Sequence, residues 1–122
     1  MEKQPRFREW FTSTGMRVLA GRNSKNNEEL IAQIEAKETV LHTALPGSSF
    51  VNIKGIATKE DIRDAALFCA KYSQAWRDTH NDVKIHVFRG ADIHKEKNMK
   101  EGTFGVKKKK EIVAKKADIL KI

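Results

Sequence analysis

The stretch ATKEDIRDAALFCAKYSQAW, residues 57–76, predicts a long helix lying on a sheet. Thr58 and Asp61 have the spacing of a capping box, with Asp in place of the usual Glu, so the helix should begin here. Small and apolar residues then recur every three or four positions and share one face: Ile62, Ala65, Ala66, Cys69, Ala70, Ser73 and Trp76. Because most of this face is small, we expect the helix to pack closely on a sheet and to end at Asn81 and Asp82.

Two segments just before this helix have the pattern of strands. ETVLHTAL, residues 38–45, and SSFVNIKG, residues 48–55, are separated by a turn at Pro-Gly-Ser. In the second segment Val51 and Ile53 alternate with Phe50, Asn52 and Lys54, which is the period of a strand with two unlike faces. We therefore expect two strands directly before the helix.

The N-terminal part predicts a hairpin followed by a short helix. Residues 7–12 are aromatic and β-prone, the TSTG that follows supplies turn residues, and residues 16–20 return as a second strand. NSKNNEE then offers capping side chains and acidic residues suited to a helix start. We expect this helix over residues 26–36.

The C-terminal third predicts three more strands. Residues 83–90 form one strand. A charged connection then leads to a second strand at residues 103–106, which runs into four lysines, and to a third strand at residues 112–114. Because apolar residues keep strand spacing on both sides of the lysines, we interpret this end as a hairpin with lysines on it and at its turn, and not as a free basic tail. The chain is then one α+β domain, residues 1–122, of order roughly ββαββαβββ, with a mixed, mostly antiparallel sheet packed by two helices.

Positive charge is concentrated in the last third of the chain. The chain has 122 residues, of which 39% are hydrophobic, enough for one core. Its formal net charge is +8, and residues 84–122 hold 12 Lys and Arg against 5 Asp and Glu. Such asymmetry favours an acidic polymer or an anionic surface as partner, the alternative being a surface that only aids solubility.

The sequence offers little for catalysis, metal binding or a cofactor. It has no phosphate-binding glycine loop, no GxSxG nucleophile motif and no zinc spacing. The one cysteine, Cys69, is expected to fill the core and gives no sign of an oxidising compartment. The N-terminus has no apolar leader segment and no run reaches transmembrane length. We expect a cytoplasmic protein that is not an enzyme and holds no cofactor or metal.

Two short stretches are candidates for binding an anion. In PGSS, Gly47 and the amides of Ser48 and Ser49 form either a small anion-binding concavity or a plain hairpin turn. In GRNSKNNE, Arg22 and Lys25 stand at a helix start, where backbone amides favour phosphate; simple capping is the alternative.

Histidine and aromatic residues leave similar alternatives. His42 is either a hydrogen-bonded structural residue or a functional contact. Tyr72 and Trp76 lie four positions apart on the long helix and are expected in the core, with base stacking as the alternative. An exposed ring in the first strand is a candidate for stacking on an unpaired base.

Lysines between positions 95 and 110 are the candidates for following a phosphate backbone, because lysine contacts phosphate without reading bases. The full set that we expect to contact RNA is Arg17, Arg22, Asn23, Lys25, His42, Ser48, Ser49, Lys54, Lys95, Lys97, Lys100, Lys107, Lys108 and Lys109.

Four segments in order resemble the NFACT-R family of RNA-binding domains: GMRVLAGRNSKNNEEL, VLHTALPGSSFVNIKG, DAALFCAKYSQAW and GADIHKEKNMKEGTFGVKKKKEIV. The resemblance covers nearly the whole chain and implies an α+β fold that binds RNA. Such domains stand at the end of large ribosome-quality-control proteins, occur in small proteins, and are joined to tRNA thiouridine-synthesis enzymes. The family pattern maps onto these positions: Gly21, Arg22, Asn23, Asn27, Glu28, His42, Gly47, Ser48, Tyr72, Ser73, Lys95, Lys107 and Lys108. One departure is HKEKNMKEG, which lacks the proline that relatives often carry before the last hairpin.

The residues and the resemblance together predict an RNA-binding protein, with tRNA or rRNA as ligand, associated with the ribosome and with translation quality control. The first alternative is a subunit or accessory factor of a tRNA-modification (thiouridine) enzyme. The second is a module whose basic face meets an acidic protein. DNA is a further candidate ligand, and the sequence leaves the identity of the RNA and the oligomeric state open.

Overall fold

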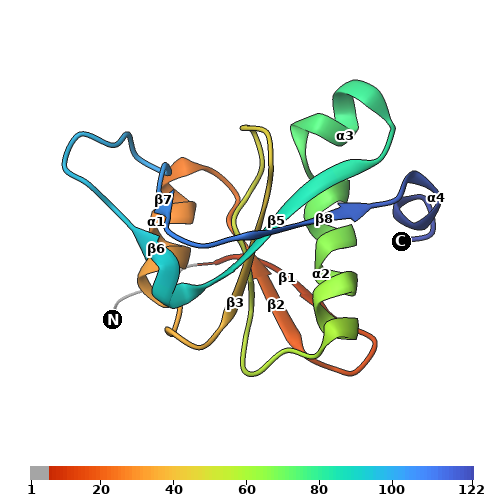
Figure 1. Ribbon diagram of the computed structural model, residues 1–122, viewed down its shortest axis with the longest axis horizontal. Coiled ribbons are helices and arrows are strands. Elements are labelled where there is room, and N and C mark those ends of the chain that lie inside the picture. Colours follow the sequence, from red (N-terminus) through yellow and green to blue (C-terminus); the bar gives the residue numbers. More distant parts are fainter. Residues whose placement is uncertain (1–5) are drawn as a thin grey trace.

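Six strands form one antiparallel sheet, and two short strands form a second ladder (Figure 1). The structure is a computed structural model that describes residues 6–122. The strand order of the large sheet is β1-β2-β4-β3-β5-β8, and β6 pairs with β7. The elements are β1 (Arg8–Phe11), β2 (Arg17–Ala20), α1 (Ser24–Ala32), β3 (Thr39–Thr43), β4 (Val51–Ile53), α2 (Lys59–Lys71), α3 (Gln74–Thr79), β5 (Val83–Arg89), the 3₁₀ turn η1 (Gly90–Asp92), β6 (Ile93–His94), β7 (Gly105–Val106), β8 (Lys110–Ala114) and α4 (Lys116–Ile119).

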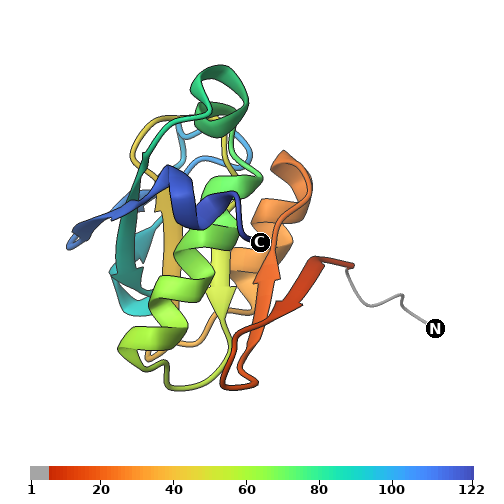
Figure 2. The same ribbon diagram turned by 90° about the vertical axis from the view of Figure 1, so that its right-hand side faces the viewer.

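Helices cover both faces of the large sheet, which confirms the predicted α+β class. Val18 and Ala20 of β2 pack in the core beneath α2, whereas Leu19 between them packs with Leu30 of α1. Successive residues of a strand point to opposite faces, so the two helices lie on opposite sides of the sheet. Figure 2 shows α2 lying across one of these sides.

The long helix begins where the sequence predicts it, because Thr58 and Asp61 form a reciprocal capping box. Its apolar face is buried as expected, with Ala65 and Ala66 at 0% and 2% exposure. The prediction of one continuous helix to residue 80 is wrong. Ser73 interrupts it: the hydroxyl donates to the Ala70 carbonyl at 2.7 Å and caps a second helix, α3.

The predicted C-terminal hairpin is also wrong. Residues 105–106 form β7 and pair with β6, whereas residues 110–114 form β8 and pair with β5 at the edge of the large sheet. Lys107, Lys108 and Lys109 therefore cross from one ladder to the other and remain exposed. They belong to an ordered connection, as we expected, although not to the turn of a hairpin.

The predicted helix over residues 26–36 begins and ends earlier, as α1 over Ser24–Ala32. Asn23 is its N-cap, and the side chain accepts a hydrogen bond from the Asn26 amide at 2.8 Å. The capping role considered for this stretch is thus present in the structure.

Cys69 is buried in the α2 core, as predicted. Burial raises the pKa of its thiol to about 12, so the residue behaves as a small apolar side chain at neutral pH. None of the helices in residues 6–122 is long and apolar enough to span a membrane.

Candidate nucleic-acid interface

Three arginines line one polar hollow at the start of α1. This hollow, which we call the arginine pocket, has a volume of about 280 Å³. Arg8 comes from β1, Arg22 from the residues before α1 and Arg77 from α3. The remaining lining is polar or small except for one aromatic ring: Asn23, Ser24, Asn27, Gly47, Ser48, Ser49 and Tyr72. No Asp or Glu contributes, which makes the pocket suited to an anion.

The arginines are oriented by their neighbours without being neutralised. The Arg8 guanidinium carbon lies 4.3 Å from the centre of the Tyr72 ring. Arg77 donates to the Gln74 side-chain oxygen at 3.0 Å. Within residues 6–122 no ion pair involves Arg8, Arg22 or Arg77. Their hydrogen-bonding edges thus keep donors for an outside ligand.

The wall of the arginine pocket is fixed by close packing around Gly21. A Cβ at this position would lie 1.9 Å from the Asn27 side-chain oxygen, so only glycine fits. The Ser49 hydroxyl donates to the Gly21 carbonyl, and the Gly21 amide donates to the Phe50 carbonyl at 3.1 Å. These bonds hold the approach to α1 against the loop before β4.

Ser48 and Ser49 lie in the pocket wall, and their hydroxyls serve backbone groups. Ser48 accepts from the Thr43 amide at 3.1 Å and donates to the Ser49 carbonyl at 3.3 Å. The stretch around Gly47, with φ +97°, is a longer loop than the plain hairpin turn we considered, since the last β3–β4 pair is Leu41 with Val51. This loop is tied to α3, because the Gln74 amide donates to the Gly47 carbonyl at 3.0 Å.

A second hollow of about 560 Å³ adjoins the arginine pocket and is lined in part by the rings of His42, Phe50, His86, Phe88 and Phe104. We call it the aromatic cavity. The buried Phe50 ring contacts three of the other rings, with centroids 4.6 Å from His42, 6.4 Å from Phe88 and 5.4 Å from Phe104. The two hollows share Ser24, Asn27, Gly47 and Ser48.

His42 lines the aromatic cavity as a neutral ring. Burial lowers its pKa, hydrogen bonding to the Thr43 and Ser48 carbonyls raises it, and nearby His86 lowers it, with a net decrease. Nδ1 lies 2.8 Å from the Thr43 carbonyl oxygen and donates to it. His42 is thus a hydrogen-bonded residue of the sheet that also faces a cavity, so the two alternatives considered for it are compatible.

Lys95 holds the loop that closes the aromatic cavity. Its ammonium donates to the Lys100 and Thr103 carbonyls at 2.6 and 2.8 Å and forms an ion pair with Glu28 of α1 at 2.9 Å. It also lies 4.6 Å from the centre of the Phe104 ring. Figure 1 shows this loop, between β6 and β7, beside α1. Lys95 therefore fixes a wall of the cavity.

Lysines 107–110 line a third hollow of about 670 Å³, on the α2 side of the sheet. We call it the lysine groove. Lys37 and Arg89 add positive charge to it, and Asp92 is its one acidic residue. Lys109 lines both the groove and the aromatic cavity.

A fourth hollow of about 520 Å³ continues from the arginine pocket along β1 and β2. It shares Arg8 and Arg22 with that pocket and adds Arg6 and Arg17. Arg17 forms an ion pair with Glu9 at 2.5 Å, so its charge is partly balanced.

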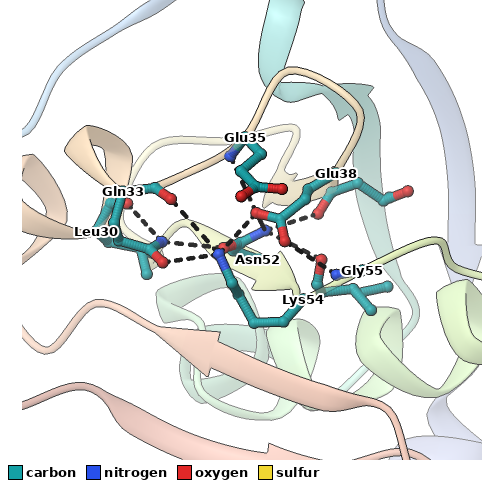
Figure 3. Close-up of polar contacts among 9 residues, drawn as sticks. Leu30, Gln33, Glu35, Glu38, Asn52, Lys54 and Gly55 are labelled. Atoms are coloured by element: carbon teal, nitrogen blue, oxygen red, sulfur yellow. Dashed lines mark hydrogen bonds and ion pairs between the residues drawn. The ribbon is translucent and has the colours of Figure 1, made fainter.

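Lys54 is half-buried and lines none of these hollows. Its ammonium is 2.7 Å from the Glu38 carboxylate and 2.8 Å from the Gln33 side-chain oxygen (Figure 3). Lys25, Lys97 and Lys100 are exposed but line none of the four hollows. Contacts of these four lysines with RNA remain a prediction.

Sequence reasoning missed Arg8 and Arg77 and placed Tyr72 wrongly in the core. Tyr72 is 42% exposed, because α2 ends just before it and turns its ring toward Arg8. Trp76 is buried as expected. The two arginines lie 69 positions apart in the sequence, each in a segment of mixed polarity, so no local pattern predicts that they meet. In residues 6–122 no group of three or more His, Cys, Asp or Glu side chains is placed to hold a metal ion.

Comparisons with known proteins agree with this fold. The family model described as the NFACT protein RNA binding domain matches residues 6–108. A solved structure of the C-terminal part of the fibronectin/fibrinogen-binding protein from Streptococcus suis superposes with a TM-score of 0.83 at 23% sequence identity. The superposition covers 99% of this chain and 50% of that one, so the chain spans half the length of that relative and shares its fold. No curated protein matches the sequence significantly.

Proposed function

The chain belongs to the family of NFACT protein RNA binding domains, and from this membership we propose that it binds folded RNA mainly through the phosphate backbone. The observation that carries the proposal is the arginine pocket, in which Arg8, Arg22 and Arg77 converge without an acidic partner in the lining. A guanidinium group presents paired donors that match phosphate oxygens, and it is always charged.

The other hollows extend this site in two directions. Each shares residues with the next, from the lysine groove through the aromatic cavity and the arginine pocket to the fourth hollow at β1 and β2. A backbone with regularly spaced phosphates follows such a series, which is basic on both sides of the aromatic cavity, better than a compact acidic protein does. Contacts of this kind favour RNA shape over base sequence.

Charge reversal in the arginine pocket tests the proposal. We expect the double variant Arg22→Glu, Arg77→Glu to bind a transcribed tRNA about tenfold more weakly or worse, because two charge-assisted contacts are lost. The measurement is filter binding at low salt, with circular dichroism as a check on folding.

The matched control is Lys59→Glu with Arg63→Glu, which changes the net charge equally. Both residues are exposed on α2 and line none of the four hollows. An equal loss in both double variants would contradict the arginine pocket as the site and leave only a general effect of charge.

We propose that the RNA is tRNA or rRNA and that the protein acts on the ribosome, in the cytoplasm, in translation quality control. The resemblance to domains of ribosome-quality-control proteins supports this assignment. The protein is proposed to act without catalysis: the Ser48 hydroxyl donates to the Ser49 carbonyl and accepts from the Thr43 amide, and not to or from the ring of His42.

The alternative, an accessory factor of tRNA thiouridine synthesis, is motivated by the fusions seen in the family. Mass spectrometry of tRNA nucleosides with and without the gene separates the two. An unchanged nucleoside profile removes the alternative, whereas a loss of thiouridine removes the ribosomal assignment as the main role.

A further inference from the structure

The aromatic cavity is the hollow that phosphate binding does not explain. Its volume of about 560 Å³ lies within the range of sites that hold small organic ligands. Its lining divides between rings and apolar groups, including Phe104 and Leu45, and polar side chains such as His42 and Thr103. The rings and apolar groups offer a phosphate no favourable contact, whereas a flat heterocycle can stack on the rings.

The lining of the cavity suits a nucleobase in its chemistry. His42, His86 and Phe104 are half-buried, so parts of their surfaces remain open to a ligand. Unpaired bases are recognised by stacking on such rings and by hydrogen bonds to their edges. Ser24 and Thr103 are exposed and place hydroxyls at the wall for the second kind of contact.

The neighbouring hollow supplies the place for the rest of the nucleotide. The aromatic cavity and the arginine pocket share four wall residues, so a base in the first lies next to a phosphate in the second. Resting on the proposed RNA binding, we propose that the protein takes one unpaired nucleotide out of its RNA, with the base in the aromatic cavity and its phosphate against Arg22 and Arg77.

The cavity is already formed in the protein without a ligand. Lys95 ties the closing loop to two of its own carbonyls and to Glu28 of α1. Gly102, with φ +80°, lets this loop approach the helix, since a Cβ there would lie 2.9 Å from Ser24. A fixed cavity binds an extruded base without first having to order a loop.

Two RNAs that differ by one unpaired nucleotide test the inference. One is a blunt-ended RNA duplex of two fully paired strands, and the other carries a single bulged nucleotide in one of the same strands. We expect the bulged RNA to bind about tenfold more tightly, within the range that stacking of one base provides. Equal binding of the two RNAs would overturn the base site while leaving RNA binding intact, and binding of neither would overturn the proposed function itself.

Filling the cavity checks its role directly. Ala44 lines it and is half-buried, so Ala44→Trp should place an indole in the space for the base and reduce the bulged-to-blunt affinity ratio to about one. Phe104→Leu, which keeps apolar volume but removes the ring, should reduce the ratio several-fold and covers the case in which the first variant fails to fold. Ala117→Trp, at an exposed position of α4, is the control. A ratio that stays at its original value in both cavity variants would overturn the inference.

Discussion

At the scale of single residues, Asp61 fixes the turn between β1 and β2 to the start of α2. Its carboxylate accepts from the Thr14 hydroxyl, from the Thr58 amide at 2.9 Å and from the Thr12 hydroxyl at 2.8 Å. These bonds, that of Thr14 foremost, outweigh the effect of burial and lower the pKa of Asp61 to about 2. The buried carboxylate is therefore charged throughout the neutral range.

We predict that Asp61→Asn destabilises the protein at pH 7 by about 2 kcal/mol, because an amide replaces a charged acceptor of several hydrogen bonds. The folded-state pKa lies below the value of 3.8 for the free side chain, so the stabilisation is present above about pH 4 and is lost as the pH falls toward 2. The free energies of unfolding of the two proteins should thus converge over this interval in urea titrations.

Asp78→Asn serves as the control for that titration. Asp78 is exposed and accepts a hydrogen bond from Gln74 within the same helix. Its replacement should change stability by less than about 0.5 kcal/mol, as is usual for surface positions. If the free energies of unfolding of the Asp61 variant and the original protein differ by a constant amount from pH 7 to pH 2, the stabilising role assigned to the charged Asp61 carboxylate is contradicted.

The capping box of Thr58 and Asp61 was predictable because its spacing is local. The bonds from Thr12 and Thr14 span 49 and 47 positions, and no spacing rule reports them. The same limit applies to the arginine pocket: the sequence predicts Arg22 from its place at a helix start, but Arg8 and Arg77 reach it only through the fold.

At the scale of elements, strands were predicted well, and the N-terminal hairpin pairs as predicted whereas the C-terminal one does not. Alternation of apolar residues reports that a segment is extended, but not which neighbour it pairs with. Residues 103–106 and 112–114 have such a pattern and lie close in sequence, so a hairpin was the natural expectation. In the structure β5 ends at Arg89 and residues 93–94 take β7 as partner, which leaves the edge of β5 for β8.

The break between α2 and α3 escaped prediction for a related reason. Ser73 keeps the helical spacing of the buried face, and it is fully buried. Its hydroxyl nevertheless bonds to the Ala70 carbonyl and accepts from the Trp76 amide, so the side chain competes with the helix for backbone groups. The turn that results points Tyr72 and Arg77 at the arginine pocket.

Lys54 joins three elements through one buried cluster (Figure 3). It bonds to Gln33 at the end of α1 and to Glu38 before β3, while Asn52 of β4 receives a hydrogen bond from Gln33 at 3.0 Å. Burial raises the pKa of Glu38, but the bonds from Lys54 and two backbone amides lower it overall. The cluster therefore holds an ion pair beside the sheet.

We predict that Lys54→Met lowers the free energy of unfolding by about 3 kcal/mol, because the buried Glu38 loses its counter-charge. Adding Glu38→Gln should recover most of this loss, since no unpaired charge then remains. Urea unfolding measures both effects. A loss of RNA affinity without a loss of stability in Lys54→Met would instead favour direct contact of Lys54 with RNA.

At the scale of the whole molecule, the charge count describes one half of the candidate surface. The excess of lysine and arginine in residues 84–122 corresponds to the lysine groove. The arginine pocket, in contrast, draws all three arginines from residues 1–83, where 12 basic residues face 11 acidic ones and the balance is +1. A sum over a segment hides such a site, because the acidic residues of that segment lie elsewhere, for example in the Asp61 and Glu38 clusters.

The continuity of the hollows implies that both halves act on one RNA, and salt dependence tests this. We predict that Lys107→Glu, Lys108→Glu and Lys109→Glu together weaken tRNA binding and lower the slope of log affinity against log salt concentration by about two to three, since each lost phosphate contact removes about 0.7 to 0.9. The triple variant Lys59→Glu, Lys116→Glu, Lys121→Glu carries the same change in charge at exposed positions outside the hollows and should lower the slope by less than one.

Combining the Lys107–Lys109 changes with those at Arg22 and Arg77 should remove more contacts than either set alone, because the two hollows hold different phosphates of the same molecule. If the combined variant has the slope of the arginine variant, the lysine groove takes no part in binding and the RNA ends at the aromatic cavity.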